Sequence, residues 1–138
     1  MNKQLIFDTA VNGIRKQGKR SVDDIGRCMY RGPNGCKCAV GHMIPDDKYD
    51  SFIENLPAAC PSVLQRIDKK FEISDDQTPD ERTFLKELQQ CHDLGDFGRQ
   101  PEMTEGLAQN EEFYVEAAFE RFAKHHGLKY TREAWTSN

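Results

Sequence analysis

Residues 28–46 read Cys-Met-Tyr-Arg-Gly-Pro-Asn-Gly-Cys-Lys-Cys-Ala-Val-Gly-His-Met-Ile-Pro-Asp. This stretch places three of the five cysteines and one of the four histidines around the sequence Gly32-Pro33-Asn34-Gly35. Proline fixes φ and an Asn-Gly pair tolerates positive φ, so these four residues indicate a tight turn. We therefore expect a small β-hairpin here, followed by a helical turn over residues 38–43 that ends before Pro45.

Apolar residues recur at helical spacing on both sides of this stretch. The strongest local signal is Thr78-Pro79-Asp80-Glu81, in which Thr suits the N-cap, Pro the first helical position and Glu the third. The sequence predicts a mainly α fold of the α+β class, with about four main helices plus one small β-hairpin, in a single domain over residues 1–138. The expected helices cover residues 2–18, 61–71, 78–94 and 110–127, with a shorter one within 46–55 and a loop over 95–109.

Composition narrows the class of protein. The chain has 37% hydrophobic and 30% charged residues, which is typical of a polar globular domain rather than a disordered one. No apolar run approaches the ~18 residues of a membrane span, and the N-terminus lacks the long apolar segment of a secretory signal. An odd number of cysteines without such a signal indicates reduced thiols, so we expect a cytoplasmic protein without a membrane partner.

Charge is unevenly distributed along the chain. Residues 1–50 carry nine Lys or Arg against six Asp, a net charge of +3, whereas residues 51–138 carry a net charge of −7. Tyr30 and Arg31 precede the turn and Lys37 follows it, so these three residues are the predicted binding surface. They suit a host protein or, through stacking and phosphate contacts, a nucleic acid. The alternative is that both charged regions are ordinary solvated faces.

Four residues of the stretch form a candidate zinc site: Cys28, Cys36, Cys38 and His42. Three thiols and an imidazole suit tetrahedral zinc. However, one residue separates Cys36 from Cys38, whereas paired zinc ligands favour two. The alternative is that the cysteines are small buried residues that pack beneath the hairpin.

A thiol enzyme is a further hypothesis. Cys38 is expected near a helix N-terminus, where thiolate is favoured, and His92 with Asp93 could supply a base and the group that orients it. The alternative is a core histidine, because His92 lies on the apolar stripe of its helix. His125 and His126 end the last predicted helix, where cations interact favourably with the final carbonyls.

The pattern Cys-x-Tyr-Arg-Gly-Pro-x-Gly-x-Lys-Cys-Ala-x-Gly over residues 28–41 resembles a signature in small proteins of tailed phages and prophages. Those proteins also tend to carry an N-terminal Asn-Lys-Gln helix and a later Leu-Gln-x-x-His-Asp stretch, here residues 88–93. The resemblance covers residues 2–46 and 84–93, and the family is functionally uncharacterised. It implies a phage origin and a bacterial host cell.

The sequence and the resemblance together predict a non-enzymatic, phage-type accessory protein that binds a host macromolecule, with inhibition of a host-defence component as one form. The alternatives are a thiol enzyme that uses Cys38, His92 and Asp93, or a small zinc-binding domain. For the first hypothesis we expect alanine at Tyr30 or Arg31 to abolish activity and leave thermal stability unchanged. No pattern in the sequence sets the oligomeric state.

Overall fold

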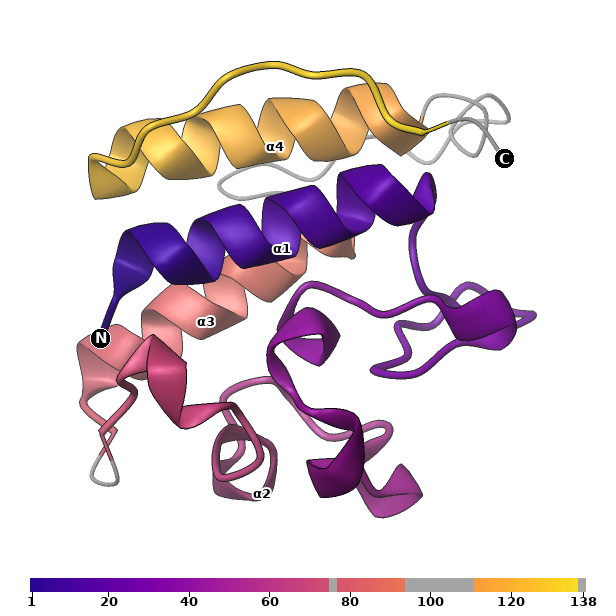
Figure 1. The fold of residues 1–138 in the computed structure, drawn as a ribbon, viewed down its shortest axis with the longest axis vertical. Coiled ribbons are helices and arrows are strands. Elements are labelled where there is room, and N and C mark those ends of the chain that lie inside the picture. The colour runs from indigo at the N-terminus through magenta and orange to yellow at the C-terminus, as the bar shows by residue number, and fades with distance from the viewer. Residues whose placement is uncertain (75–76, 94–110, 137–138) are drawn as a thin grey trace.

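The computed structural model describes residues 1–74, 77–93 and 111–136. These residues include the α-helices α1 (Lys3–Gln17), α2 (Pro61–Leu64), α3 (Pro79–His92) and α4 (Glu111–His126). The prediction of a mainly helical fold is confirmed. Figure 1 shows α4 lying over α1, with α3 beside them and the irregular segment between α1 and α3 packed below. The loop expected over residues 95–109 lies outside the described residues.

The helix ends follow the local capping signals. The Asn2 side chain accepts a hydrogen bond from the Leu5 N–H (3.1 Å), and α1 ends at Gly18, whose φ is +75°. At the start of α3 the Thr78 hydroxyl accepts from the Glu81 N–H while the Glu81 carboxylate accepts from the Thr78 N–H. A capping box satisfies backbone groups that a helix end leaves without partners. These termini were predictable because each depends on residues close in sequence.

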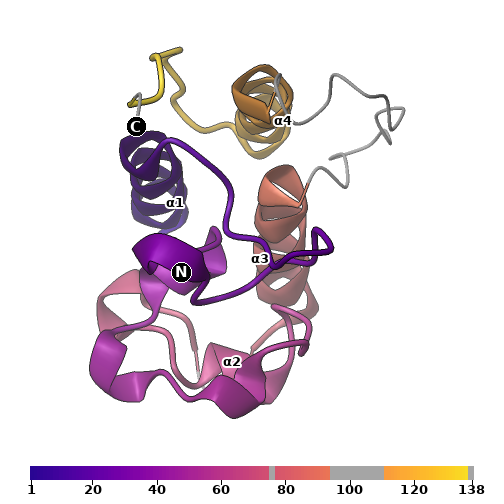
Figure 2. The same ribbon diagram turned by 90° about the vertical axis from the view of Figure 1, so that its right-hand side faces the viewer.

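Aromatic rings join α1, α3 and α4. The Phe7 ring of α1 stacks on Phe122 of α4, with centroids 5.6 Å apart, and meets Phe119 edge-on. Phe84 of α3 lies 5.0 Å from Phe122. All four rings are almost fully buried, and burial of one such side chain stabilises a fold by roughly 1.5–3 kcal/mol. Figure 2 shows the resulting arrangement end-on, with α1 and α3 side by side beneath α4.

The prediction of a β-hairpin is wrong. No strand is found in the described part of the chain, and its β pairing is one isolated antiparallel bridge between Val22 and Cys28. Side chains occupy the backbone groups that a hairpin would pair: the N–H groups of Tyr30 and Arg31 donate to the Glu54 carboxylate (2.9 and 3.1 Å). The turn itself is present, with Asn34 at φ +60° followed by a glycine at φ +75°.

The helix predicted over residues 61–71 is also interrupted. α2 ends at Leu64, and a separate 3₁₀ turn covers Lys69–Phe71. Between them the Asp68 N–H donates to the carbonyl of Met43 (3.0 Å), a residue far away in sequence, instead of to a carbonyl one turn earlier. The helical turns expected over residues 38–43 and 46–55 are likewise short 3₁₀ segments.

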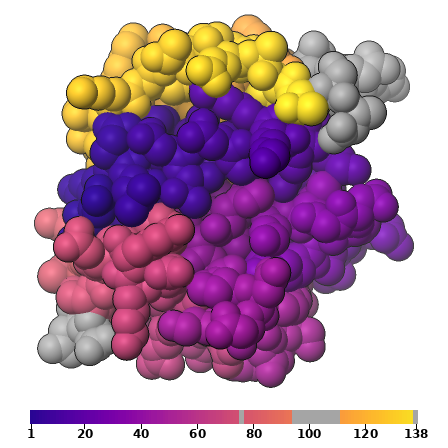
Figure 3. Space-filling view, viewed as in Figure 1, coloured from indigo at the N-terminus to yellow at the C-terminus, as the bar shows by residue number. Residues whose placement is uncertain are grey.

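The C-terminal tail, residues 128–136, returns along α4 and closes over α1 (Figures 1 and 3). It is held by Glu116 of α4, whose side chain is 1% exposed. That carboxylate accepts from the Arg15 guanidinium through Nε (3.0 Å) and Nη2 (2.7 Å), from the Tyr130 hydroxyl (2.8 Å) and from Trp135 Nε1 (2.8 Å). A buried ion pair is tolerated only with such additional hydrogen bonds. Glu116 therefore joins α1, α4 and the tail.

Candidate functional site

Tyr30, predicted to contact a partner, belongs to the interior. It is 3% exposed, and its hydroxyl donates to the carbonyl of Leu56 (2.6 Å). Burial raises the pKa of the phenol well above its usual range. A side chain in this position has no open ring face on which a base could stack, so the placement of Tyr30 does not support the nucleic-acid interpretation.

Arg31 connects backbone segments of the signature stretch. Its Nη1 donates to the Gly41 carbonyl (2.9 Å) and its Nη2 to the Ile44 carbonyl (2.7 Å) and to Asp46 (3.0 Å). The guanidinium also lies 5.0 Å from the Tyr49 ring centroid. Because the planar guanidinium donates in several fixed directions, it can satisfy two turns of backbone at once. Arg31 thus holds residues 41–46 in place.

Lys37 is the most accessible of the three predicted binding residues, with a side chain 31% exposed. Its ammonium lies 3.6 Å from the Asp46 carboxylate, while its backbone N–H donates to the Gln17 side chain (3.0 Å). An exposed pair of this kind contributes about 1 kcal/mol or less. Lys37 is therefore free to exchange its partner at little cost, unlike Tyr30 and Arg31.

The same stretch packs tightly on α1 through His42. A Cβ at Gly13 would lie 2.6 Å from the His42 ring, so only glycine allows this approach. His42 Nε2 lies 3.0 Å from Gln17 Oε1, and burial, with the Lys37 charge, lowers the pKa of His42 to about 4. Similarly, a Cβ at Gly41 would lie 2.5 Å from the Tyr30 carbonyl oxygen. The signature residues are thus mutually packed.

The four predicted zinc ligands are not gathered. The described residues contain two clusters of Cys, His, Asp or Glu whose possible ligand atoms lie within 4.8 Å of one another. One is Cys28 with His92 and Asp93, and the other is Glu87 with His125 and His126. Cys36 is buried, and Cys38 Sγ accepts a hydrogen bond from the Gly41 N–H (3.4 Å). The four residues of the predicted zinc site are therefore not gathered around one point, although the Cys28 and Cys38 thiols lie in contact.

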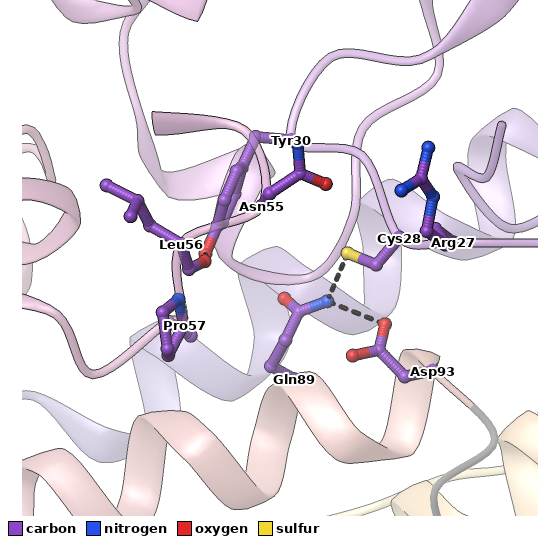
Figure 4. A pocket seen from close by; sticks show the side chains of 9 residues that line it. Arg27, Cys28, Tyr30, Asn55, Leu56, Pro57, Gln89 and Asp93 are labelled. Carbon is purple, nitrogen blue, oxygen red and sulfur yellow. Dashed lines mark hydrogen bonds between the residues drawn. The ribbon is translucent and has the colours of Figure 1, made fainter. Parts of the chain in front are cut away.

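Instead, Cys28 joins the two residues predicted to assist Cys38. Gln89 of α3 donates from Nε2 both to Cys28 Sγ (3.0 Å) and to Asp93 Oδ1 (2.9 Å), as Figure 4 shows. His92 Nδ1 lies 2.8 Å from Asp93 Oδ1. Cys38 is 0% exposed. A cysteine, a histidine and an aspartate therefore do cluster, as predicted, but the cysteine beside His92 and Asp93 is Cys28 and not Cys38.

Hydrogen bonding fixes the tautomer of His92. The backbone N–H of Ser21 donates to His92 Nε2 (2.9 Å), so Nε2 presents its lone pair and the ring proton of the neutral form lies on Nδ1, facing Asp93. Burial lowers the pKa of this ring and the hydrogen bond to Asp93 raises it, with a net upward shift. A second proton on Nε2 would point at the Ser21 N–H. The neutral ring lies against the Cys28 thiol but leaves no lone pair free to take its proton or to bind a metal ion.

The thiol of Cys28 is not activated. Its contact with the Cys38 thiol and its burial raise the pKa of Cys28 far above the usual range. The nucleophile of a thiol enzyme is the thiolate, which requires a lowered pKa and a base that can accept the proton. The geometry of this cluster therefore suits a closed hydrogen-bond network, in which Gln89 also accepts from the Val40 N–H (3.0 Å).

A cavity of about 290 Å³ opens beside this network. Figure 4 shows Cys28, Gln89 and Asp93 along one part of its lining and Tyr30 with Leu56 and Pro57 along another. The Asp93 side chain is 34% exposed. The cavity thus combines apolar contact area with the accessible carboxylate of Asp93 and the guanidinium-bearing side chain of Arg27.

The turn over residues 23–27 adjoins this cavity, and sequence reasoning did not single it out. Asp23 Oδ1 accepts from the backbone N–H groups of Ile25 (3.0 Å) and Arg27 (2.9 Å), and its Oδ2 accepts from Arg27 Nε (2.9 Å). Ile25 is nevertheless 73% exposed. The sequence did contain a pattern that could have indicated this turn. Asp23 lies two residues before the isolated aliphatic Ile25 and close to Gly26, which is typical of an Asx turn.

Comparison of the chain with protein-family models, with curated protein sequences and with solved structures finds no match to any of them. In the described part of the chain, no helix combines the length and apolar character that a membrane span requires.

Proposed function

We propose that this chain is a non-enzymatic binding protein that acts stoichiometrically on another macromolecule. The resemblance to small tailed-phage proteins makes a bacterial host protein the partner that we propose, with a host-defence component as one candidate. The observation that carries the proposal is the exposed Ile25 on a turn held by Asp23. Arg27 of the same turn lines the cavity that contains the accessible Asp93 carboxylate.

The exposed Ile25 supports a binding role because its backbone is already ordered. Three hydrogen bonds from the residue-23–27 turn converge on the Asp23 carboxylate, so little conformational freedom remains to be lost at this turn on association. A large aliphatic side chain held in water by a rigid turn gains free energy when a partner covers it. This surface replaces Tyr30 and Arg31 as the expected contact region.

The cavity favours a partner segment with a basic side chain beside an apolar one. Asp93 can accept from an ammonium or guanidinium group, while Leu56 and Pro57 offer apolar contacts. A catalytic role is less well supported, because His92 offers no free lone pair to a thiol and the pKa of Cys28 is raised.

Capture from bacterial lysate on the immobilised protein tests this proposal. The informative variant is Ile25→Glu, and the matched control is Phe113→Glu, which changes another exposed apolar residue (65% exposed) on α4. We expect wild type and Phe113→Glu to retain the same protein at near-equimolar amounts, and Ile25→Glu to lose it without a change in melting temperature. Equal retention by both variants, or no retained protein, would refute the proposed surface.

A further inference from the structure

A second cluster lies apart from the cavity, between α3 and the end of α4. The donor atoms of Glu87, His125 and His126 lie within 4.8 Å of one another. His126 Nε2 is 3.7 Å from Glu87 Oε1, which is longer than a hydrogen bond. In a tetrahedral zinc site with bonds near 2.0–2.1 Å, two ligand atoms are separated by about 3.3 Å. The observed distance is therefore close to that of two ligands of one ion.

Two of the three residues are already positioned. The His126 side chain is 13% exposed, and its ring is held 4.8 Å from the Phe84 centroid and 4.4 Å from that of Phe122. The Glu87 side chain is 20% exposed and comes from the adjacent helix.

The third residue, His125, has a side chain that can change its orientation. His125 is exposed, with its ring centroid 4.9 Å from that of His126, so its side chain can turn toward an ion without a change in the core. One charge opposes binding: the Lys3 ammonium interacts electrostatically with His126. Lys3 sits 5.6 Å from the Phe84 ring and is exposed, so it can move away.

We propose that Glu87, His125 and His126 form a binding site for a late first-row divalent cation, with Zn²⁺ as the ion we expect. Two imidazoles and a carboxylate are the ligand types that zinc accepts, with water in the fourth position. The site ties the C-terminal end of α4 to α3. It shares no residue with the zinc site predicted from the sequence.

Zinc titration of the full chain by calorimetry, under reducing conditions, tests the proposal. We expect one Zn²⁺ per chain, and at least about tenfold weaker affinity in His125→Ala and in Glu87→Gln. Lys124→Ala changes an exposed neighbour of the site, and Cys28→Ser removes the competing thiol; both should bind as wild type does. His126→Ala is avoided because that ring packs against Phe84 and Phe122 of the core.

Cobalt substitution separates this site from a thiol site. Co²⁺ bound by nitrogen and oxygen absorbs in the visible region, whereas a thiolate ligand adds an intense near-ultraviolet charge-transfer band. We expect visible absorption without that band, lost in His125→Ala. A charge-transfer band that disappears in Cys28→Ser, or zinc binding that is unchanged in both His125→Ala and Glu87→Gln, or no binding at all, would overturn the proposal.

Discussion

Replacement of Arg31 should unfold the signature stretch rather than remove a contact surface. Its guanidinium donates to the carbonyls of Gly41 (2.9 Å) and Ile44 (2.7 Å), two buried residues. Hydrogen bonds to charged groups contribute about 1.5–3 kcal/mol each, so the loss of both in Arg31→Ala should lower the free energy of unfolding by roughly 3–6 kcal/mol. The hydrogen bond to the exposed Asp46 is left out of this sum.

Arg31→Lys provides a graded second variant, because an ammonium cannot reach both carbonyls in the geometry of a guanidinium. We expect Arg31→Lys to lower the free energy of unfolding by about half as much as Arg31→Ala does, roughly 1.5–3 kcal/mol. Urea unfolding followed by far-ultraviolet circular dichroism measures both variants, with Lys37→Ala as the control that should stay within about 0.5 kcal/mol of wild type. Wild-type stability in Arg31→Ala would refute this reasoning and restore Arg31 as a surface residue.

Three further predictions concern other parts of the fold. The folded state holds His42 neutral with a pKa of about 4, below the usual 6.5, so its contribution to stability is complete above pH 6.5 and is lost as the pH falls toward 4. The urea midpoint should thus fall less between pH 7 and pH 5 in His42→Gln than in wild type; equal falls would contradict the assignment. Glu116→Gln removes one charge of a buried pair and should cost about 3–5 kcal/mol, with the fluorescence of Trp135, the single tryptophan, reporting early release of the tail. A tail that stays bound until global unfolding would count against this role of Glu116. Alkylation of Cys28 at pH 7 should be slower in the folded protein than in urea, by mass mapping, because its pKa is raised; faster alkylation in the folded state would show an activated thiol.

Helix ends were predictable because their causes are local. Asn2 and Gly18 bound α1, and the Thr78 capping box starts α3, each through residues no more than four positions apart. The Asn34-Gly35 turn was equally readable, since its positive φ values depend on those two residues. The absence of the hairpin could not be predicted from local sequence. Glu54, more than twenty residues later, accepts hydrogen bonds from the N–H groups of Tyr30 and Arg31, which a partner strand would otherwise need.

The candidate site depends on contacts between distant residues. Cys28 meets the α3 residue Gln89, 61 positions away, so no spacing rule could distinguish Cys28 from Cys38 as the thiol beside His92. The Arg15–Glu116 pair spans 101 positions. One signal for it was present: Glu116 interrupts the apolar stripe of its helix beside Val115, where a charged residue is found only with a partner.

The proposal of a non-enzymatic role depends most directly on the tautomer of His92. Long-range ¹H–¹⁵N correlation spectra of the histidine rings, recorded at pH 8 under reducing conditions, measure it. We predict a protonated Nδ1 and an unprotonated, hydrogen-bonded Nε2, as the Ser21 N–H and the Asp93 carboxylate require. A ring protonated on Nε2, with a free lone pair on Nδ1 toward Cys28, would contradict a closed network and favour a thiol or metal function.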